Sequence, residues 1–319
     1  MSGGIGSTDV DVDVDVSTSS VAGGSQSVRP IGVSPALTKL VANGIQEDWF
    51  RGNKWPPADV ADYWTQNNKA APTQFPRLYW SAFHYSIVVL GEFVRVTSTT
   101  PPHNWHSITL QAFPTGAVLA AEIAELVELV EYRPGVMSEA LAQRTDLWAY
   151  YRGLLMCDSW SAPYTRELVE IATRVGQFQA MHYKRKFNRP RPSQISPALL
   201  PPIDVPGHAS YPSGHATESH LISLCLAEVM PAAVSTPPPP AALPPPPPPQ
   251  LPAPPPWSPL ERMAQRIARN REVMGLHYPS DSEAGKQLAE ESFKLLMDCP
   301  SIKDPVNGII ALAKKEWWP

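Results

Sequence analysis

Apolar residues recur three and four positions apart along much of the chain from Trp80 onward, a spacing that places them on one face of an α-helix. The stretch Trp80–Leu90 is the first predicted helix, and others are predicted over Thr115–Tyr132, Ser138–Met156 and Pro163–Arg185. No succession of segments has the two-residue alternation that is typical of strands. The pattern therefore predicts an all-α fold.

The first residues of the chain, 1–30, break this pattern because they are rich in Gly, Ser, Thr, Val and Asp. Within them, Asp9–Val16 alternates aspartate with valine, which formally matches the period of a strand. Since every second residue is charged and no partner strand is recognisable, we expect disorder over residues 1–30. Residues 31–319 are predicted to form a single all-α domain.

A proline-rich segment, residues 236–257, contains the runs Pro237–Pro240 and Pro244–Pro249. Such runs cannot lie inside a helix and favour the stiff, solvated polyproline II conformation. We interpret the segment as a loop inserted in a connection between two helices, not as a domain boundary. A ligand for SH3-like or WW-like domains is a second interpretation, although no basic residue flanks a Pro-x-x-Pro spacing.

The stretch Asp204–Ser219 combines a predicted helix start with histidines. Pro212 forces the preceding residue into an extended conformation, and the apolar spacing after it predicts a helix that begins near Ser213. Ser213, Gly214 and His215 would then lie at a helix N-terminus, where unpaired N–H groups and the helix dipole favour an anion. An ordinary helix cap followed by a surface histidine is the alternative interpretation of this stretch alone.

Upstream, the segment Lys184–Pro192 reads KRKFNRPRP. Its two prolines end the preceding helix and leave Arg191 on a rigid, extended segment, while Lys184 lies in the last helical turn. A nucleic-acid patch or a localisation signal would also be basic, but the prolines and the absence of interleaved aromatic residues argue against both.

Downstream, Asn270–Asp281 contains a predicted junction between two helices. Gly275 suits a helix C-cap and Pro279 suits the first position of the next helix, so His277 falls in the junction. Asp281 lies in the first turn of that second helix. From there its carboxylate can reach back and fix the tautomer of the imidazole.

Together these motifs resemble those of the type 2 phosphatidic acid phosphatase (PAP2) superfamily, which includes bacterial class A acid phosphatases and vanadium-dependent haloperoxidases. One departure is that Asn270 stands where a serine usually precedes the arginine of the third motif. The resemblance covers about residues 180 to 285 and implies a helical bundle with the site between its central helices. The matching elements are Lys184, six residues, Arg191-Pro192; Pro212-Ser213-Gly214-His215; and Arg271, five residues, His277, three residues, Asp281.

In this arrangement the oxyanion would be bound by protein groups alone. Lys184, Arg191 and Arg271 supply three cations for the oxygens of a phosphate-like anion, and Ser213 with the Gly214 N–H adds hydrogen bonds. No Asp/Glu/His cluster has the spacing of a magnesium or zinc site, so we expect no metal and, for a phosphatase, no cofactor.

The resemblance also implies roles for the acid–base residues in the hydrolysis of a phosphomonoester. His277 would attack phosphorus to give a phosphohistidine, and Asp281 would hold its ring. His215 would protonate the leaving oxygen and then activate water. The expected ligands are therefore a small phosphorylated substrate and free phosphate.

Vanadate has the shape of phosphate, so the resemblance leaves a vanadium-dependent haloperoxidase open as the alternative. His277 would then ligate vanadium, and His215 would assist peroxide binding. His208 favours this alternative, because some bromide-oxidising enzymes of the superfamily have a histidine seven residues before the motif histidine. The form of the third motif favours the acid phosphatases. A non-catalytic, proline-rich interaction protein is a third hypothesis, against which the complete set of site residues argues.

The composition excludes few classes of protein. The chain has 319 residues, 43% of them hydrophobic, and a formal net charge of −4, which indicates no nucleic-acid partner. Three cysteines without metal-ligand spacing predict neither a metal site nor a disulfide framework. No secretory signal and no apolar run long enough to cross a membrane is recognisable. We therefore expect a member of the soluble branch, cytoplasmic by default, with its physiological substrate and oligomeric state left open.

Overall fold

The computed structural model describes residues 75–99, 102–237 and 257–317. The expected disorder of residues 1–30 and the conformation of the proline-rich residues 238–256 lie outside this part. The chain divides into two units: the first spans Val16–Trp80, and the second comprises Met1–Asp15 and Ser81–Pro319. Of the first unit the structure describes only Phe75–Trp80, which contains the 3-10 turn η1 (Arg77–Tyr79). The single domain expected over residues 31–319 therefore stays a prediction.

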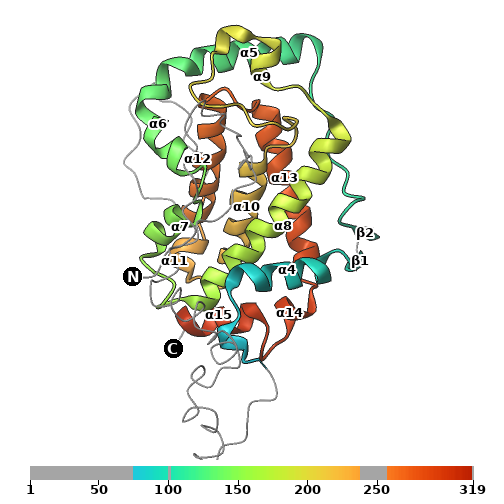
Figure 1. The fold of residues 1–319 in the computed structure, drawn as a ribbon, viewed down its shortest axis with the longest axis vertical. Coiled ribbons are helices and arrows are strands. Elements are labelled where there is room, and N and C mark those ends of the chain that lie inside the picture. Colours follow the sequence, from blue (N-terminus) through green and yellow to red (C-terminus); the bar gives the residue numbers. More distant parts are fainter. Residues whose placement is uncertain (1–74, 100–101, 238–256, 318–319) are drawn as a thin grey trace, which may run out of the picture. The chain divides into compact units, whose positions relative to one another are not determined.

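The described part of the second unit is helical, which confirms the predicted all-α class (Figure 1). A two-stranded antiparallel hairpin of three-residue strands, β1 (Thr97–Thr99) and β2 (Pro102–Asn104), interrupts it. The helices are α4 (Ala82–Phe93), α5 (Gly116–Leu129), α6 (Arg133–Ala142), α7 (Trp148–Leu155), α8 (Pro163–Phe187), α9 (Pro192–Ile195), α10 (Gly214–Ala227), α11 (Ala232–Ser235), α12 (Pro259–Val273), α13 (Pro279–Leu296), α14 (Pro300–Lys303) and α15 (Ile309–Trp317), with 3-10 turns η2 (Val130–Tyr132) and η3 (Pro197–Leu199).

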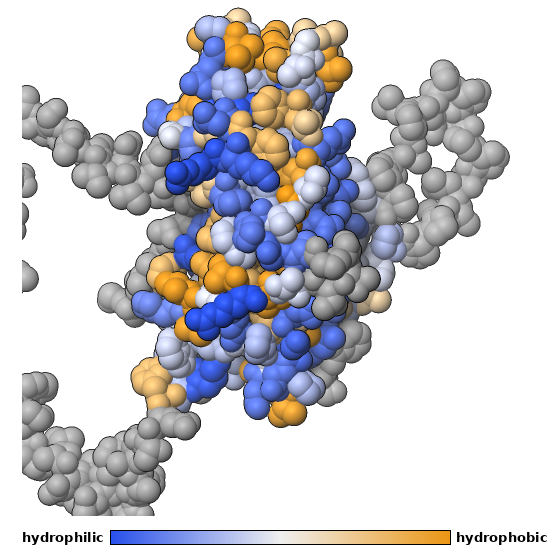
Figure 2. Space-filling view, turned by 90° about the vertical axis from the view of Figure 1, so that its right-hand side faces the viewer, coloured by the Kyte–Doolittle hydropathy of each residue, from blue (hydrophilic) through white to orange (hydrophobic). Residues whose placement is uncertain are grey.

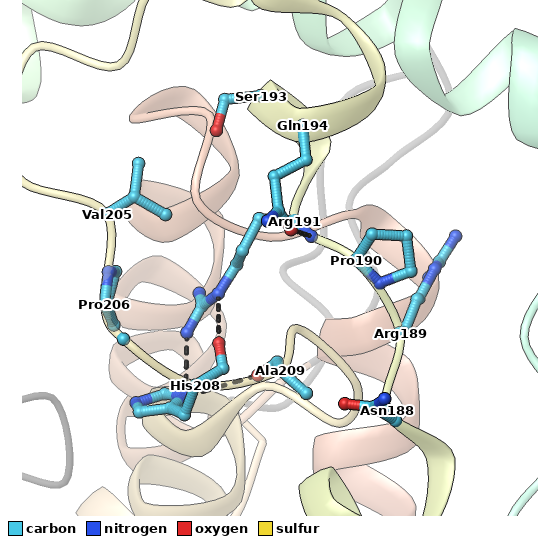
Figure 3. Close-up of a pocket in the computed structure, with 11 residues that line it drawn as sticks. Asn188, Arg189, Pro190, Arg191, Ser193, Gln194, Val205, Pro206, His208 and Ala209 are labelled. Atoms are coloured by element: carbon cyan, nitrogen blue, oxygen red, sulfur yellow. Dashed lines mark hydrogen bonds between the residues drawn. The ribbon is translucent and has the colours of Figure 1, made fainter.

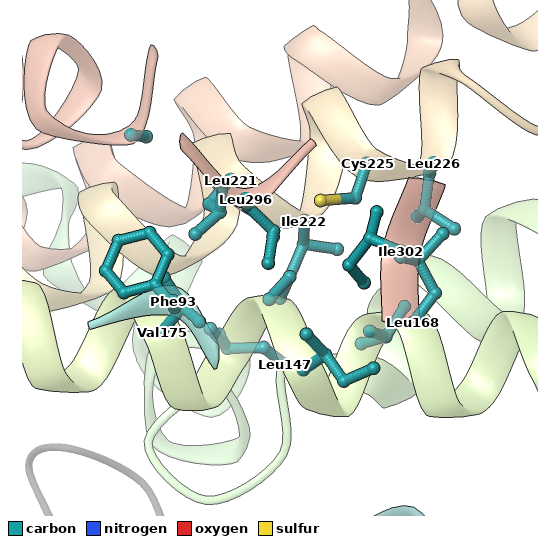
Figure 4. Packing of buried hydrophobic residues seen from close by; sticks show 14 of the residues in the cluster. Phe93, Leu147, Leu168, Val175, Leu221, Ile222, Cys225, Leu226, Leu296 and Ile302 are labelled. Carbon is teal, nitrogen blue, oxygen red and sulfur yellow. The ribbon is translucent and has the colours of Figure 1, made fainter. Parts of the chain in front are cut away.

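Helix α10 lies at the centre of this unit and packs against α8, α12 and α13 (Figure 1). Its side chains Leu221, Ile222 and Cys225 are fully buried and meet Leu168 and Val175 of α8 in the core (Figure 4). Burial on all sides explains why α10 shows no single apolar stripe, since such a stripe marks a helix with one solvent-facing side. The central helix therefore has little freedom to move relative to its three neighbours.

A glycine allows α13 to approach the beginning of α10 closely. A Cβ atom at Gly285 would lie 2.7 Å from the carbonyl oxygen of Ser213 and 2.8 Å from the Cβ of Ala216. Both distances are shorter than van der Waals contact, so a larger residue would push the two helices apart. Gly285 thus fixes the position of α13 beside the N-terminal turn of α10.

Most predicted helices are found, but the prediction of one helix over Ser138–Met156 is wrong. The chain forms two helices here, α6 and α7, with a turn between them. In this turn the hydroxyl of Thr145 donates to the carbonyl of Ala142, and the carboxylate of Asp146 accepts from the N–H of Ala149. Such short polar side chains compete with helical hydrogen bonds and favour helix ends. They override the apolar spacing on which the prediction rested.

The surface of the described unit is mixed in polarity. On the face shown in Figure 2, hydrophilic side chains separate the hydrophobic ones into small groups. Among the described residues, no helix combines the length and the apolar character that a membrane crossing requires.

Candidate functional site

The predicted anion-binding turn is found at the start of α10. Ser213 is the N-cap, and its hydroxyl accepts a hydrogen bond from the N–H of Ala216 at 3.3 Å. Gly214 and His215 form the first helical turn, and all three predicted residues are buried. The Ser213 N–H donates to the carbonyl oxygen of Asp281 at 2.9 Å. This bond ties the turn to the first turn of α13, where the third predicted motif lies.

Two of the predicted cations are buried beside this turn. Lys184, in the last turn of α8, is 1% exposed, and its ammonium donates to the carbonyls of Ala209 (2.9 Å) and Ser210 (3.2 Å). Arg191, 2% exposed, caps α9, and its Nη1 donates to the carbonyl of Leu276 at 3.0 Å. Both cations thus lie beside the turn, where their charge favours an anion.

The third motif supplies a histidine–aspartate pair in the same place. His277 Nδ1 lies 3.0 Å from Asp281 Oδ2, and His277 Nε2 lies 3.1 Å from Arg191 Nη1. A guanidinium can only donate, so Nε2 accepts and Nδ1 carries the proton that is donated to Asp281. The lone pair of His277 therefore points toward the cationic side of the site, as the predicted nucleophile requires.

The surroundings of this pair favour a neutral imidazole and an ionised carboxylate. Burial, together with the charges of Arg191 and Lys184, lowers the pKa of His277 well below its usual 6.5. Burial opposes ionisation of Asp281, but hydrogen bonds from His277 and Ser210 and the charge of Arg189 outweigh it and lower its pKa to about 2. At neutral pH the unprotonated Nε2 is thus available for bonding.

Two of the predicted residues, His215 and Arg271, meet the C-terminal end of α6. His215 Nε2 lies 3.2 Å from the carbonyl oxygen of Gln143, so this nitrogen carries the proton. Arg271, 1% exposed, donates from Nη2 to the carbonyl of Ala140. Asn270, the departure from the family pattern, donates to the Gln143 side chain at 2.9 Å. It therefore holds the residue whose carbonyl contacts His215.

His208 lines a pocket next to these groups (Figure 3). The pocket has a volume of about 690 Å³ and runs between residues 188–194 and 205–209. Of the predicted site residues, Arg191 and His208 line it, and Arg191 Nη2 lies 2.9 Å from His208 Nδ1. The guanidinium also donates from Nε to the His208 carbonyl at 3.0 Å. The sequence left a role for His208 open. The structure places it in contact with Arg191, which is predicted to bind the oxyanion.

Three further residues belong to the network around Asp281, although the motifs did not identify them. The hydroxyl of Ser210 donates to Asp281 Oδ2, and Arg189 donates to Oδ1 at 2.7 Å. Glu122, from α5, accepts from Arg189 at 2.9 Å. The repeat Arg-Pro-Arg-Pro held a signal for Arg189, since residues two apart on an extended segment project to the same side. For Glu122 the sequence held no such signal.

Within the described part of the chain, no group of three or more His, Cys, Asp and Glu side chains is arranged to hold a metal ion. Besides the carboxylates of Asp281 and Glu122, the structure gathers guanidinium, ammonium and imidazole groups. These donate hydrogen bonds and suit the oxygens of an anion. The arrangement can thus bind an oxyanion next to an unprotonated imidazole nitrogen.

Comparisons with known proteins find similarity at the level of structure. No protein-family profile matches the sequence, and no curated protein is significantly similar to it. Among solved structures, the chain is similar to the crystal structure described as that of the first bacterial vanadium-dependent iodoperoxidase, with 14% sequence identity and a TM-score of 0.43. The match covers 83% of this chain and 75% of that chain.

Proposed function

We propose that the protein is a phosphatase that hydrolyses phosphomonoesters through a phosphohistidine, without a divalent metal. The observation that carries the proposal is the bonding of His277. Its Nδ1 donates to Asp281 and its unprotonated Nε2 faces Arg191. A nitrogen nucleophile needs a free electron pair, and the carboxylate stabilises the positive charge that the ring acquires when it bonds to phosphorus.

In the first step His277 Nε2 forms a bond to phosphorus while the bond from phosphorus to the ester oxygen breaks. Before this bond forms, Arg191 transfers its hydrogen bond from Nε2 to a phosphoryl oxygen, where Lys184 and Arg271 also neutralise charge. His215, as an imidazolium, gives one ring proton to the departing oxygen and becomes a neutral imidazole.

In the second step water attacks the phosphohistidine. His215, now a neutral imidazole, accepts a proton from the water as the water oxygen bonds to phosphorus. The bond between phosphorus and His277 breaks, its electron pair returns to Nε2, and phosphate leaves. Each group is thereby restored to its initial protonation state, and the net reaction consumes one water.

A vanadium-dependent haloperoxidase is the second candidate, and the position of His208 favours it. The contact between His208 Nδ1 and Arg191 Nη2 adds an imidazole to the predicted oxyanion site where the two residues line the pocket. The donor set fits vanadate, because His277 offers one unprotonated nitrogen and the cations offer donors for the oxygens. Bound vanadate would supply the activation of peroxide, with His277 and the three cations holding it.

A paired assay of the full-length protein tests these functions. Phosphate release from nitrophenyl phosphate is measured with and without a chelator, and halide oxidation is measured with vanadate and peroxide. The phosphatase proposal expects phosphate release that survives chelation, is inhibited by vanadate and is lost in His277→Ala. Halide oxidation without phosphate release would replace it with the second candidate. If the protein shows neither activity, the result favours the third hypothesis, a non-catalytic, proline-rich interaction protein.

A further inference from the structure

Arg189 makes two ionic contacts that tie separate parts of the chain together. Its Nη1 lies 2.7 Å from Asp281 Oδ1 and 2.7 Å from the hydroxyl of Ser280, both in the first turn of α13. Its Nη2 lies 2.9 Å from Glu122 Oε2 on α5. The arginine is 2% exposed, and Asp281 is fully buried. In such surroundings, charge-assisted hydrogen bonds are stronger than in water.

Glu122 holds the same turn from a second direction. While one of its oxygens accepts from Arg189, the other accepts from the backbone N–H of Ser280 at 2.7 Å. This carboxylate therefore bonds to the arginine and to the peptide directly before Asp281. The start of a helix favours such a negative charge. Glu122 thus fixes the distance between Arg189 and the turn that carries Asp281.

Aromatic rings restrict the guanidinium further. The Arg189 Cζ lies 3.6 Å from the centre of the Tyr278 ring and 5.0 Å from that of Phe113. Cation–π contacts of this kind favour a planar guanidinium over an ammonium. The two rings thus restrict the position of the guanidinium beside Asp281.

The two oxygens of Asp281 have separate partners. Oδ2 accepts from His277 Nδ1, from the Ser210 hydroxyl and from the Tyr278 N–H. Oδ1 accepts from Arg189. Without the arginine, a buried carboxylate would lose its cation and could rotate toward other donors, since an unpaired buried charge is costly. Rotation would move Oδ2 away from the imidazole.

We propose that Arg189, held by Glu122, is a positioning residue that fixes the carboxylate of Asp281 and thereby orients His277 with its Nε2 toward the cations. The consequence for catalysis rests on the proposed function, whereas the orientation of the imidazole can be measured without it. Neither residue contacts the predicted anion-binding turn through its side chain among the hydrogen bonds described above. The effect of Arg189 and Glu122 would therefore reach the chemistry only through Asp281.

The test uses the full-length protein with the variants Arg189→Gln, Arg189→Lys and Arg189→Gln/Glu122→Gln, and Arg185→Gln as the control. Arg185 is an exposed arginine in the last turn of α8. The double variant removes both charges together, so that Glu122 is not left as an unpaired carboxylate. Measured are kcat and KM for nitrophenyl phosphate, binding of inorganic phosphate, and the proton resonance of His277 Nδ1–H, assigned by its absence in His277→Gln.

We expect kcat to fall about 10- to 100-fold in Arg189→Gln and in the double variant, the loss typical of groups that orient reactive residues. Phosphate binding should change little, because the three predicted oxyanion cations remain. The Nδ1–H resonance should broaden through exchange with water. Arg189→Lys should recover part of the lost kcat and part of the sharpness of this resonance. In an Asp281→Asn background, Arg189→Gln should cause little further loss of kcat, because the two residues act through one contact.

A folded Arg189→Gln protein that keeps both the resonance and the wild-type kcat would overturn the proposal. Additive losses of kcat in the Asp281→Asn background would also overturn it, since they would show that Arg189 acts elsewhere. If wild-type protein releases no phosphate yet loses the resonance in Arg189→Gln, the positioning role stands and the proposed phosphatase function fails.

Discussion

His277 Nδ1 lies 3.0 Å from Asp281 Oδ2, and both side chains are fully buried. The contact joins a residue in the connection between α12 and α13 to the first turn of α13. It belongs to a continuous chain of hydrogen bonds that runs from a helix outside the motifs to the lining of the pocket. The members of this chain are Glu122, Arg189, Asp281, His277, Arg191 and His208.

The first prediction removes the charge of the aspartate in this pair. Asp281→Asn should lower kcat for nitrophenyl phosphate by about 10³- to 10⁴-fold, as the loss of a buried carboxylate partner does in other catalytic histidines. The amide cannot stabilise an imidazolium and can hold the wrong tautomer. Exposed Asp298 provides the matched control, since Asp298→Asn should leave kcat unchanged. A variant that retains its fold and wild-type kcat would contradict the prediction.

The sequence allowed this pair to be predicted because the signals that place the two residues lie close together in the chain. A helix C-cap glycine, a proline at the first helical position and a four-residue spacing place His277 and Asp281 together without reference to the rest of the chain. Gly275 does adopt a positive φ of 74°, and α13 does begin at Pro279. The helix starts at Ser213 and Pro163 were predictable for the same reason.

Contacts between distant segments were not predictable in this way. Glu122 meets Arg189 only because α5 packs near the loop after α8, and one sequence does not show which of its many glutamates does so. The approach of α6 to His215 and Arg271 is of the same kind. Even the break between α6 and α7 depends on side-chain hydrogen bonds that the apolar spacing does not reveal.

The second prediction concerns the close approach of α10 and α13. Gly285→Ala should reduce the free energy of unfolding by about 1–3 kcal/mol, because its Cβ would overlap the carbonyl of Ser213. It should also lower kcat, since Ser213 begins the predicted anion-binding turn. At exposed Gly91 of α4, a Cβ meets no described atom within 4 Å. Gly91→Ala should therefore be neutral or stabilising, as measured by urea unfolding.

The third prediction concerns stability in acid. Burial and the charge of Lys286 lower the pKa of His220 from 6.5 to about 3. The unfolded chain then binds more protons than the folded one as the pH falls below 6.5. The stability contributed by the neutral ring is present above that pH and is lost as the pH falls toward about 3. His277, whose pKa is also lowered, acts in the same direction.

Urea unfolding at about pH 7 and about pH 4.5 measures this effect. His220→Gln should lose less stability between these values than the wild-type protein, even if it is less stable at both. His84→Gln, at an exposed histidine of α4, should follow the wild-type curve. If His220→Gln and the wild-type protein lost equal stability on acidification, His220 would not be the neutral buried group described here.

The last prediction separates the roles of the two histidines. His215 Nε2 carries a proton, as its contact with the Gln143 carbonyl shows. If it is the general acid, His215→Ala should slow an alkyl phosphate by about 10²- to 10⁴-fold and nitrophenyl phosphate far less, because nitrophenolate leaves without a proton. His277→Ala should abolish turnover of both and give no acid-labile phosphoenzyme after quenching. Equal losses for the two substrates in His215→Ala, or a phosphoenzyme that survives in His277→Ala, would show that the roles are assigned wrongly.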